Sequence, residues 1–126
     1  YIPVNWKDFK KSNKLLWNVG PSEFLGLIAN AEYVCTDSFH GTVFSINFHK
    51  EVRVFVKHTG NECGGDNSRI YDILTRLGME NQLITEYKKG SVIKDSLIDY
   101  SHVDRLLATE RTKSIDFVES IISSLQ

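Results

Sequence analysis

Residues 32–56 read EYVCTDSFHGTVFSINFHKEVRVFV, and this stretch decides the fold. Residues 31–36 have the composition of a short buried strand, and the valines at 52, 54 and 56 alternate as in a second strand. If the two strands are parallel neighbours, the chain between them must make a crossover of about a dozen residues. The intervening segment, residues 37–50, has that length and shows no hairpin turn signal. We therefore predict a crossover helix there.

Helical patterns lie on both sides of this stretch. Gly20-Pro21 is typical of a helix start, and the residues that follow have an apolar face at helical spacing. Farther along, four apolar residues at helical spacing are followed by Gly78: Ile70, Ile73, Leu74 and Leu77. We expect a short strand and a charged loop within 82–98, and then a last helix, capped by Ser101, whose apolar face continues to the C-terminus. This order of helices and strands predicts an α/β layered fold with a mainly parallel sheet.

Composition and charge exclude several classes of protein. The length of 126 residues allows one domain, and 41% hydrophobic with 25% charged residues is ordinary globular composition. The net charge of −1 lacks the basic surplus of a nucleic-acid binder, so we expect no nucleic-acid partner. No apolar run approaches the roughly 20 residues of a membrane helix, so we do not expect a transmembrane protein. Cys35 and Cys63 are too few for a disulfide scaffold and favour the cytoplasm, although one disulfide stays open.

The densest set of reactive groups follows the first predicted strand. In parallel α/β sheets, ligands bind beyond the carboxyl ends of the strands, and residues 36–42 bring a carboxylate, three hydroxyls and an imidazole to that place. Backbone N–H groups at the helix start favour anions, Gly41 would let a ligand approach closely, and His40 could move a proton near neutral pH. The structural interpretation, in which Asp37 or Ser38 caps the helix and His40 only packs, stays open at this point.

A second polar loop, residues 58–68, follows the second strand. His58, Cys63 and Asp66 could bind a metal ion, but their spacing matches no zinc set, so we expect a polar loop and no metal site. Arg69, in the first turn of the next helix, could direct its guanidinium at an anion or form a surface ion pair with a neighbouring aspartate.

Residues 23–45, with TDSFHG at 36–41, resemble the polysaccharide pyruvyl transferase family. The run NSRI at 67–70 and the later Leu77-Gly78 also fit the family pattern, so the resemblance covers about residues 20–80. It implies a single Rossmann-like domain over residues 1–126, similar to the C-terminal half of a two-lobed, GT-B-like glycosyltransferase. A usual family member is longer, so we expect the missing N-terminal lobe of the same protein as a partner.

The resemblance also implies an activity. Family members transfer a pyruvyl group from phosphoenolpyruvate to a sugar, usually as a ketal, in cell-surface or exopolysaccharide biosynthesis. Phosphoenolpyruvate is then the donor substrate, the acceptor is a saccharide or lipid-linked saccharide, and no cofactor is needed. The expected location is the cytoplasm, including the inner face of the membrane. We expect His40 and Asp37 to be catalytic and five further residues to bind substrate: Ser38, Phe39, Gly41, Thr42 and Arg69.

Ser38 departs from the family pattern. Some members carry an arginine there, which would bind a carboxylate or phosphate through two hydrogen bonds, as serine cannot. The donor therefore needs another cation, such as Arg69 or a residue of the N-terminal lobe.

Two alternatives stay open beside the pyruvyl transferase. The first is the C-terminal lobe of a nucleotide-sugar glycosyltransferase, although the usual pair of glutamates eight residues apart is missing. The second is a non-catalytic saccharide-binding or assembly module of the same fold, which the Ser38 departure favours.

Overall fold

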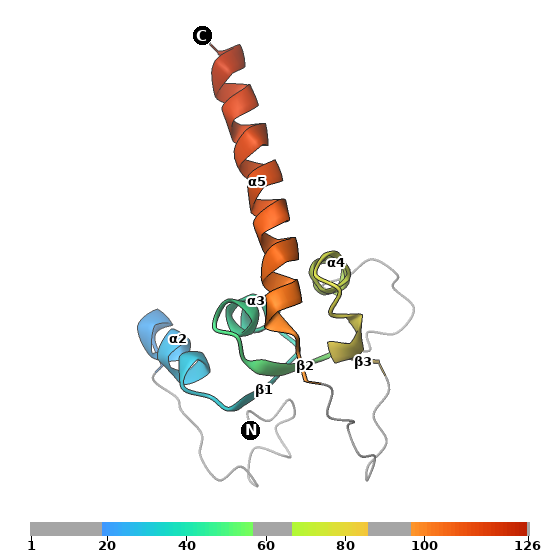
Figure 1. Ribbon diagram of the computed structural model, residues 1–126. Coiled ribbons are helices and arrows are strands. Elements are labelled where there is room, and N and C mark those ends of the chain that lie inside the picture. Colours follow the sequence, from blue (N-terminus) through green and yellow to red (C-terminus); the bar gives the residue numbers. More distant parts are fainter. Residues whose placement is uncertain (1–18, 57–66, 86–96, 126) are drawn as a thin grey trace, which may run out of the picture. The chain divides into compact units, whose positions relative to one another are not determined.

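The computed structural model describes residues 19–56, 67–85 and 97–125. Contacts divide the chain into two compact units, Tyr1–Phe55 and Val56–Gln126. Helices and short strands follow one another in both (Figure 1), so the predicted mixed α/β class is confirmed. The single Rossmann-like domain and its similarity to a GT-B lobe stay predictions.

The first unit has the predicted strand–helix–strand arrangement. It consists of α2 (Pro21–Ala29), β1 (Tyr33–Thr36), α3 (Phe39–Asn47) and β2 (Glu51–Phe55). The two strands are parallel, with Tyr33 opposite Glu51 and Thr36 opposite Val54. The helix α3 therefore makes the crossover between them, which confirms the prediction for residues 37–50.

The core of the first unit lies where α3 meets the strands. Val52 and Val54 of β2 are completely buried, and Ile46 of α3 is 3% exposed. The helix α2 packs against α3, with the Phe24 and Phe44 rings in an edge contact at 6.1 Å. A nine-residue helix such as α3 is only marginally stable alone, so this packing holds it in place.

The strand β1 is less buried than predicted. Tyr33 and Cys35 are exposed, whereas Val34 and Thr36 are half-buried. Successive side chains of a strand point to opposite faces, so β1 is covered on one face only. The prediction of a buried strand was wrong because a short apolar run does not tell a strand covered on both faces from one covered on a single face.

The second unit contains α4 (Ser68–Arg76), η1 (Glu80–Gln82), β3 (Leu83–Ile84) and α5 (Tyr100–Ser124). Among the described residues of this unit, the buried apolar side chains are Ile70, Leu74, Leu77, Met79 and Val103. Gly78 follows the C-cap Leu77 of α4 and has a φ of +64°, so its predicted role at the helix end is confirmed. The short strand expected within 82–98 is β3, where the Ile84 carbonyl accepts a hydrogen bond from the Val56 N–H at 3.3 Å.

The N-cap of the last helix is Asp99. The sequence had suggested Ser101 for this role, and that prediction was wrong. The Asp99 carboxylate accepts hydrogen bonds from the backbone N–H groups of Ser101 and His102 at 3.1 and 3.3 Å. Aspartate and serine are about equally good caps, so residue type alone did not separate the two positions.

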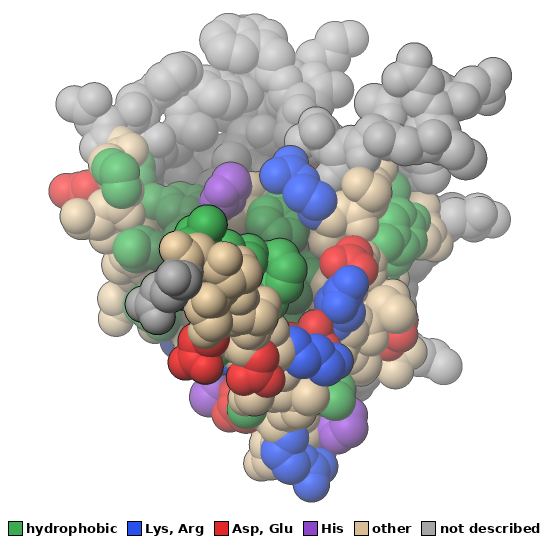
Figure 2. Space-filling view, turned by 90° about the horizontal axis from the view of Figure 1, so that it is seen from above, with side chains coloured by type: hydrophobic (Ala, Val, Ile, Leu, Met, Phe, Trp, Pro, Cys, Tyr) green, Lys and Arg blue, Asp and Glu red, His purple; other side chains and the backbone are tan. Residues whose placement is uncertain are grey.

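The two halves of α5 differ in environment. Val103 is buried, and Arg76 of α4 binds Glu110 at 3.1 Å as well as Asp72 at 2.9 Å. On the face seen in Figure 2, acidic and basic side chains lie next to one another. Every residue from 111 to 125 is exposed, including six large hydrophobic ones: Ile115, Phe117, Val118, Ile121, Ile122 and Leu125. The predicted apolar face therefore exists but is uncovered, and none of the described helices has the length and apolar character to span a bilayer.

Replacing Ile122 by serine should change the free energy of unfolding by less than about 0.5 kcal/mol, because the side chain is already 54% exposed. Leu74→Ala in the core of the same unit is the control and should cost about 2–5 kcal/mol. Urea unfolding followed by circular dichroism measures both. A loss at Ile122 as large as that at Leu74 would mean that this face of α5 is covered.

His49 follows α3 with a φ of +52°, a conformation that side chains disfavour. His49→Gly should therefore raise the free energy of unfolding by about 1 kcal/mol. Asn47→Gly, at the last residue of α3, is the matched control and should lower it by about 0.5–1 kcal/mol. Thermal unfolding of the two variants measures the difference, and an equal loss in both would refute this explanation.

Candidate functional site

The turn between β1 and α3 is built by hydrogen bonds between side chains and the backbone. Thr36 is the last residue of β1, and its Oγ1 accepts a hydrogen bond from the Ser38 N–H at 3.1 Å. Ser38 is the N-cap of α3, and its Oγ accepts from the Gly41 N–H at a longer 3.4 Å. These bonds hold the connection between the carboxyl end of β1 and the first turn of α3.

Gly41 is required by the packing of the protein itself. It is buried, and a Cβ atom at this position would lie 2.5 Å from Thr36 Oγ1. The sequence had suggested that Gly41 lets a ligand approach, but the structure places Thr36 there. Thr42 is also completely buried, and its Oγ1 donates a hydrogen bond to the Ser38 carbonyl at 2.9 Å. Ser38, Gly41 and Thr42 each have a structural role in the turn. Contacts of these residues with a substrate stay predictions.

His40 differs from these neighbours because it is exposed. It is the second residue of α3, and its imidazole makes no hydrogen bond to the described part of the chain. Its ring lies 5.9 Å from the Phe39 ring in an edge orientation. Asp37 is half-buried in the same turn. The structure thus places both predicted catalytic residues beside the N-terminus of α3, where the helix dipole favours an anion.

Arg69 belongs to the other unit. It is the second residue of α4 and is exposed. The structure therefore brings six of the seven predicted site residues into one turn, and a contribution of Arg69 to that site stays a prediction. The metal candidates considered in the sequence lie outside the described residues: His58, Cys63 and Asp66.

Arg53 is a buried charge that the sequence did not single out. It is 1% exposed and lies opposite Cys35 in the strand pair. Its guanidinium carbon is 5.8 Å from the centre of the Tyr33 ring, and its Nη1 donates to the Val52 carbonyl at 3.0 Å. Because Tyr33 begins β1, the Arg53 side chain extends toward the amino ends of the strands. It therefore does not supply a cation at the carboxyl end, where His40 lies.

Arg53 also affects the thiol of Cys35. Partial burial raises the pKa of Cys35, and the positive charge of Arg53 lowers it by less. Cys35 is a free thiol, and because its pKa is raised it stays protonated at neutral pH. This protonation state argues against Cys35 as a nucleophile.

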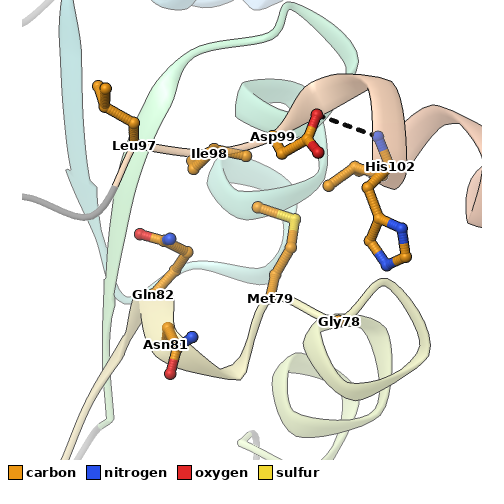
Figure 3. A pocket seen from close by; sticks show the side chains of 9 residues that line it. Gly78, Met79, Asn81, Gln82, Leu97, Ile98, Asp99 and His102 are labelled. Carbon is orange, nitrogen blue, oxygen red and sulfur yellow. Dashed lines mark hydrogen bonds between the residues drawn. The ribbon is translucent and has the colours of Figure 1, made fainter.

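A small pocket in the second unit contains none of the predicted site residues (Figure 3). It lies between the segment around η1 and the start of α5, with Gln82, Asp99 and His102 among its polar lining residues. The Asp99 carboxylate already caps α5 and brings a negative charge to this helix start. The N–H groups of Ser101 and His102, which it binds, are therefore not available to an anionic ligand, and the pocket contains none of the predicted site residues, so the turn after β1 is the better candidate site.

Gly41→Ala should destabilise the protein by about 1–3 kcal/mol because the new Cβ would overlap Thr36. Gly26→Ala in α2 is the matched control: nothing lies within 4 Å of a Cβ there, so alanine should stabilise by about 0.5–1 kcal/mol. Thr36→Ala should remove most of the cost at Gly41. Urea unfolding of the single and double variants gives the coupling energy, and additive effects would contradict the contact.

Comparison with known proteins supports the resemblance. Residues 4–58 match the family described as polysaccharide pyruvyl transferase, which is less than half of the 126-residue chain. The matched segment contains the whole turn from Thr36 to Thr42. No curated protein and no solved structure matches the chain. The resemblance identified from TDSFHG is therefore confirmed over residues 4–58.

Proposed function

We propose that this chain carries donor-site residues of a polysaccharide pyruvyl transferase, which moves the pyruvyl group of phosphoenolpyruvate onto a sugar. The observation that carries the proposal is His40: an exposed imidazole in the first turn of α3, at the carboxyl end of β1, inside the segment that matches the family. The proposed acceptor is a saccharide or lipid-linked saccharide, and the proposed place of reaction is the cytoplasm or the inner face of the membrane.

Binding of the donor requires positive potential, because phosphoenolpyruvate carries a carboxylate and a phosphate. The N-terminus of α3 supplies partial positive charge, and His40 adds a full charge when protonated. Ser38 has a neutral side chain and supplies no charge, and its hydroxyl caps the helix. We assign the second cation to Arg69 or to the N-terminal lobe of a longer protein.

The proposed chemistry uses the two titratable side chains of the turn, His40 and Asp37. His40 donates a proton to the methylene carbon of phosphoenolpyruvate, which makes an oxocarbenium-like centre. A sugar hydroxyl attacks that centre and gives its proton to Asp37. The bond to phosphate then breaks, and phosphate leaves with the electron pair and takes the proton from Asp37. A second sugar hydroxyl attacks the resulting oxocarbenium-like carbon, closes the ketal and returns a proton to His40. This scheme needs no metal ion.

His40→Ala should lower turnover by about 10²–10⁴-fold if His40 is the acid. Release of inorganic phosphate from phosphoenolpyruvate in the presence of acceptor measures turnover, and ligand-detected NMR measures donor binding. His49→Asn replaces another exposed histidine of the same unit and should leave both unchanged. Normal turnover in a folded His40→Ala variant would overturn the role of His40.

Offering a uridine-diphosphate sugar beside phosphoenolpyruvate tests the alternatives. Binding of the nucleotide sugar alone would favour a glycosyltransferase lobe. Saccharide binding without phosphoenolpyruvate binding would favour the non-catalytic module, which the uncharged Ser38 supports.

A further inference from the structure

We propose that Thr36 is a positioning residue for His40, an inference that rests on the proposed function. Thr36 does not belong to the predicted catalytic or substrate-binding set. Its side chain nevertheless makes the two contacts that hold the backbone on both sides of the Phe39-His40 pair.

The first contact is the hydrogen bond from the Ser38 N–H to Thr36 Oγ1 at 3.1 Å, which fixes the residue before Phe39. The second is the close packing against Gly41, the residue after His40. A Cβ at Gly41 would lie 2.5 Å from Thr36 Oγ1 and 3.3 Å from Cγ2, so the hydroxyl and the methyl group both border that position. One side chain at the end of β1 therefore determines where residues 38–41 run.

The His40 side chain depends on this backbone because it has few contacts of its own. Its imidazole is exposed and makes no hydrogen bond within the described residues, and its ring contact is with Phe39 of the same turn. A shift of residues 38–41 would consequently carry His40 with it. Proton transfer to carbon depends strongly on geometry, since a displacement of about 1 Å can cost about 10²-fold in rate.

The hydroxyl and the methyl group of Thr36 can be separated by two substitutions. Thr36→Val keeps the shape but removes the acceptor, which leaves the Ser38 N–H without this bond. Thr36→Ser keeps the acceptor and removes the methyl group. A positioning role through the hydrogen bond predicts that valine impairs the reaction and that serine preserves it, whereas a purely structural role in packing predicts the reverse order.

We expect Thr36→Val to lower kcat by about 10–100-fold with the KM for acceptor unchanged, and Thr36→Ser to stay within about threefold of the wild type. Amide exchange of Ser38 should become faster in Thr36→Val only. The His40 Cε1–H resonance should shift in Thr36→Val and keep its wild-type position in Thr36→Ser. Thermal unfolding of both variants establishes the folded fraction at the assay temperature.

The outcomes separate this inference from the proposed function. No phosphate release from phosphoenolpyruvate and acceptor by the full-length wild type, with its N-terminal lobe, would refute the proposed function, while the His40 resonance would still report on positioning. A His40 resonance in Thr36→Val identical to that of the wild type would overturn the inference. So would equal kcat values in the two folded variants, or a loss of activity that only follows the loss of folded protein.

Discussion

The Thr36 hydroxyl joins the last residue of β1 to the first turn of α3, and the first unit depends on that connection. The bond to the Ser38 N–H turns the chain out of the strand, and the contact with Gly41 sets how closely the helix approaches the strand end. The short helix α3 then returns the chain to a parallel β2, whose Val52 and Val54 are buried. The same connection determines where His40 emerges.

Most of the first unit could be predicted from spacing. The length of residues 37–50 required a crossover, and the alternating valines identified β2. The burial of β1 was harder to predict. It depends on which other segments cover the strand, and the four residues of β1 carry no information about those segments. The N-cap of α5 was predicted wrongly for a similar reason. Asp99 and Ser101 are both good caps, and only the path of the chain selects one of them.

The location of the candidate site was predictable from the sequence. Which of its side chains have structural roles was not. The turn after β1 was expected to bind a ligand because polar residues follow a strand end. Side chain–backbone hydrogen bonds such as that of Thr42 leave no periodic signal, so structural and ligand-binding hydroxyls look alike in a sequence. Arg53 was missed because a single charge in an alternating strand suggests a solvent-facing residue, whereas its side chain is buried and its guanidinium lies over the ring of the exposed Tyr33.

The distribution of charge around the turn places a further constraint on the chemistry. In the described part of the first unit, the lysine and arginine side chains belong to Lys50 and Arg53. Lys50 precedes β2, and Arg53 extends toward the start of β1, so both lie toward the amino ends of the strands. At the carboxyl end, the Ser38 hydroxyl caps α3 and stabilises the helix, a role that arginine could not fill. In return, the candidate site has no positive charge at position 38. A donor with two anionic groups therefore needs charge from beyond these residues, which is the physical reason why the proposal includes a second cation.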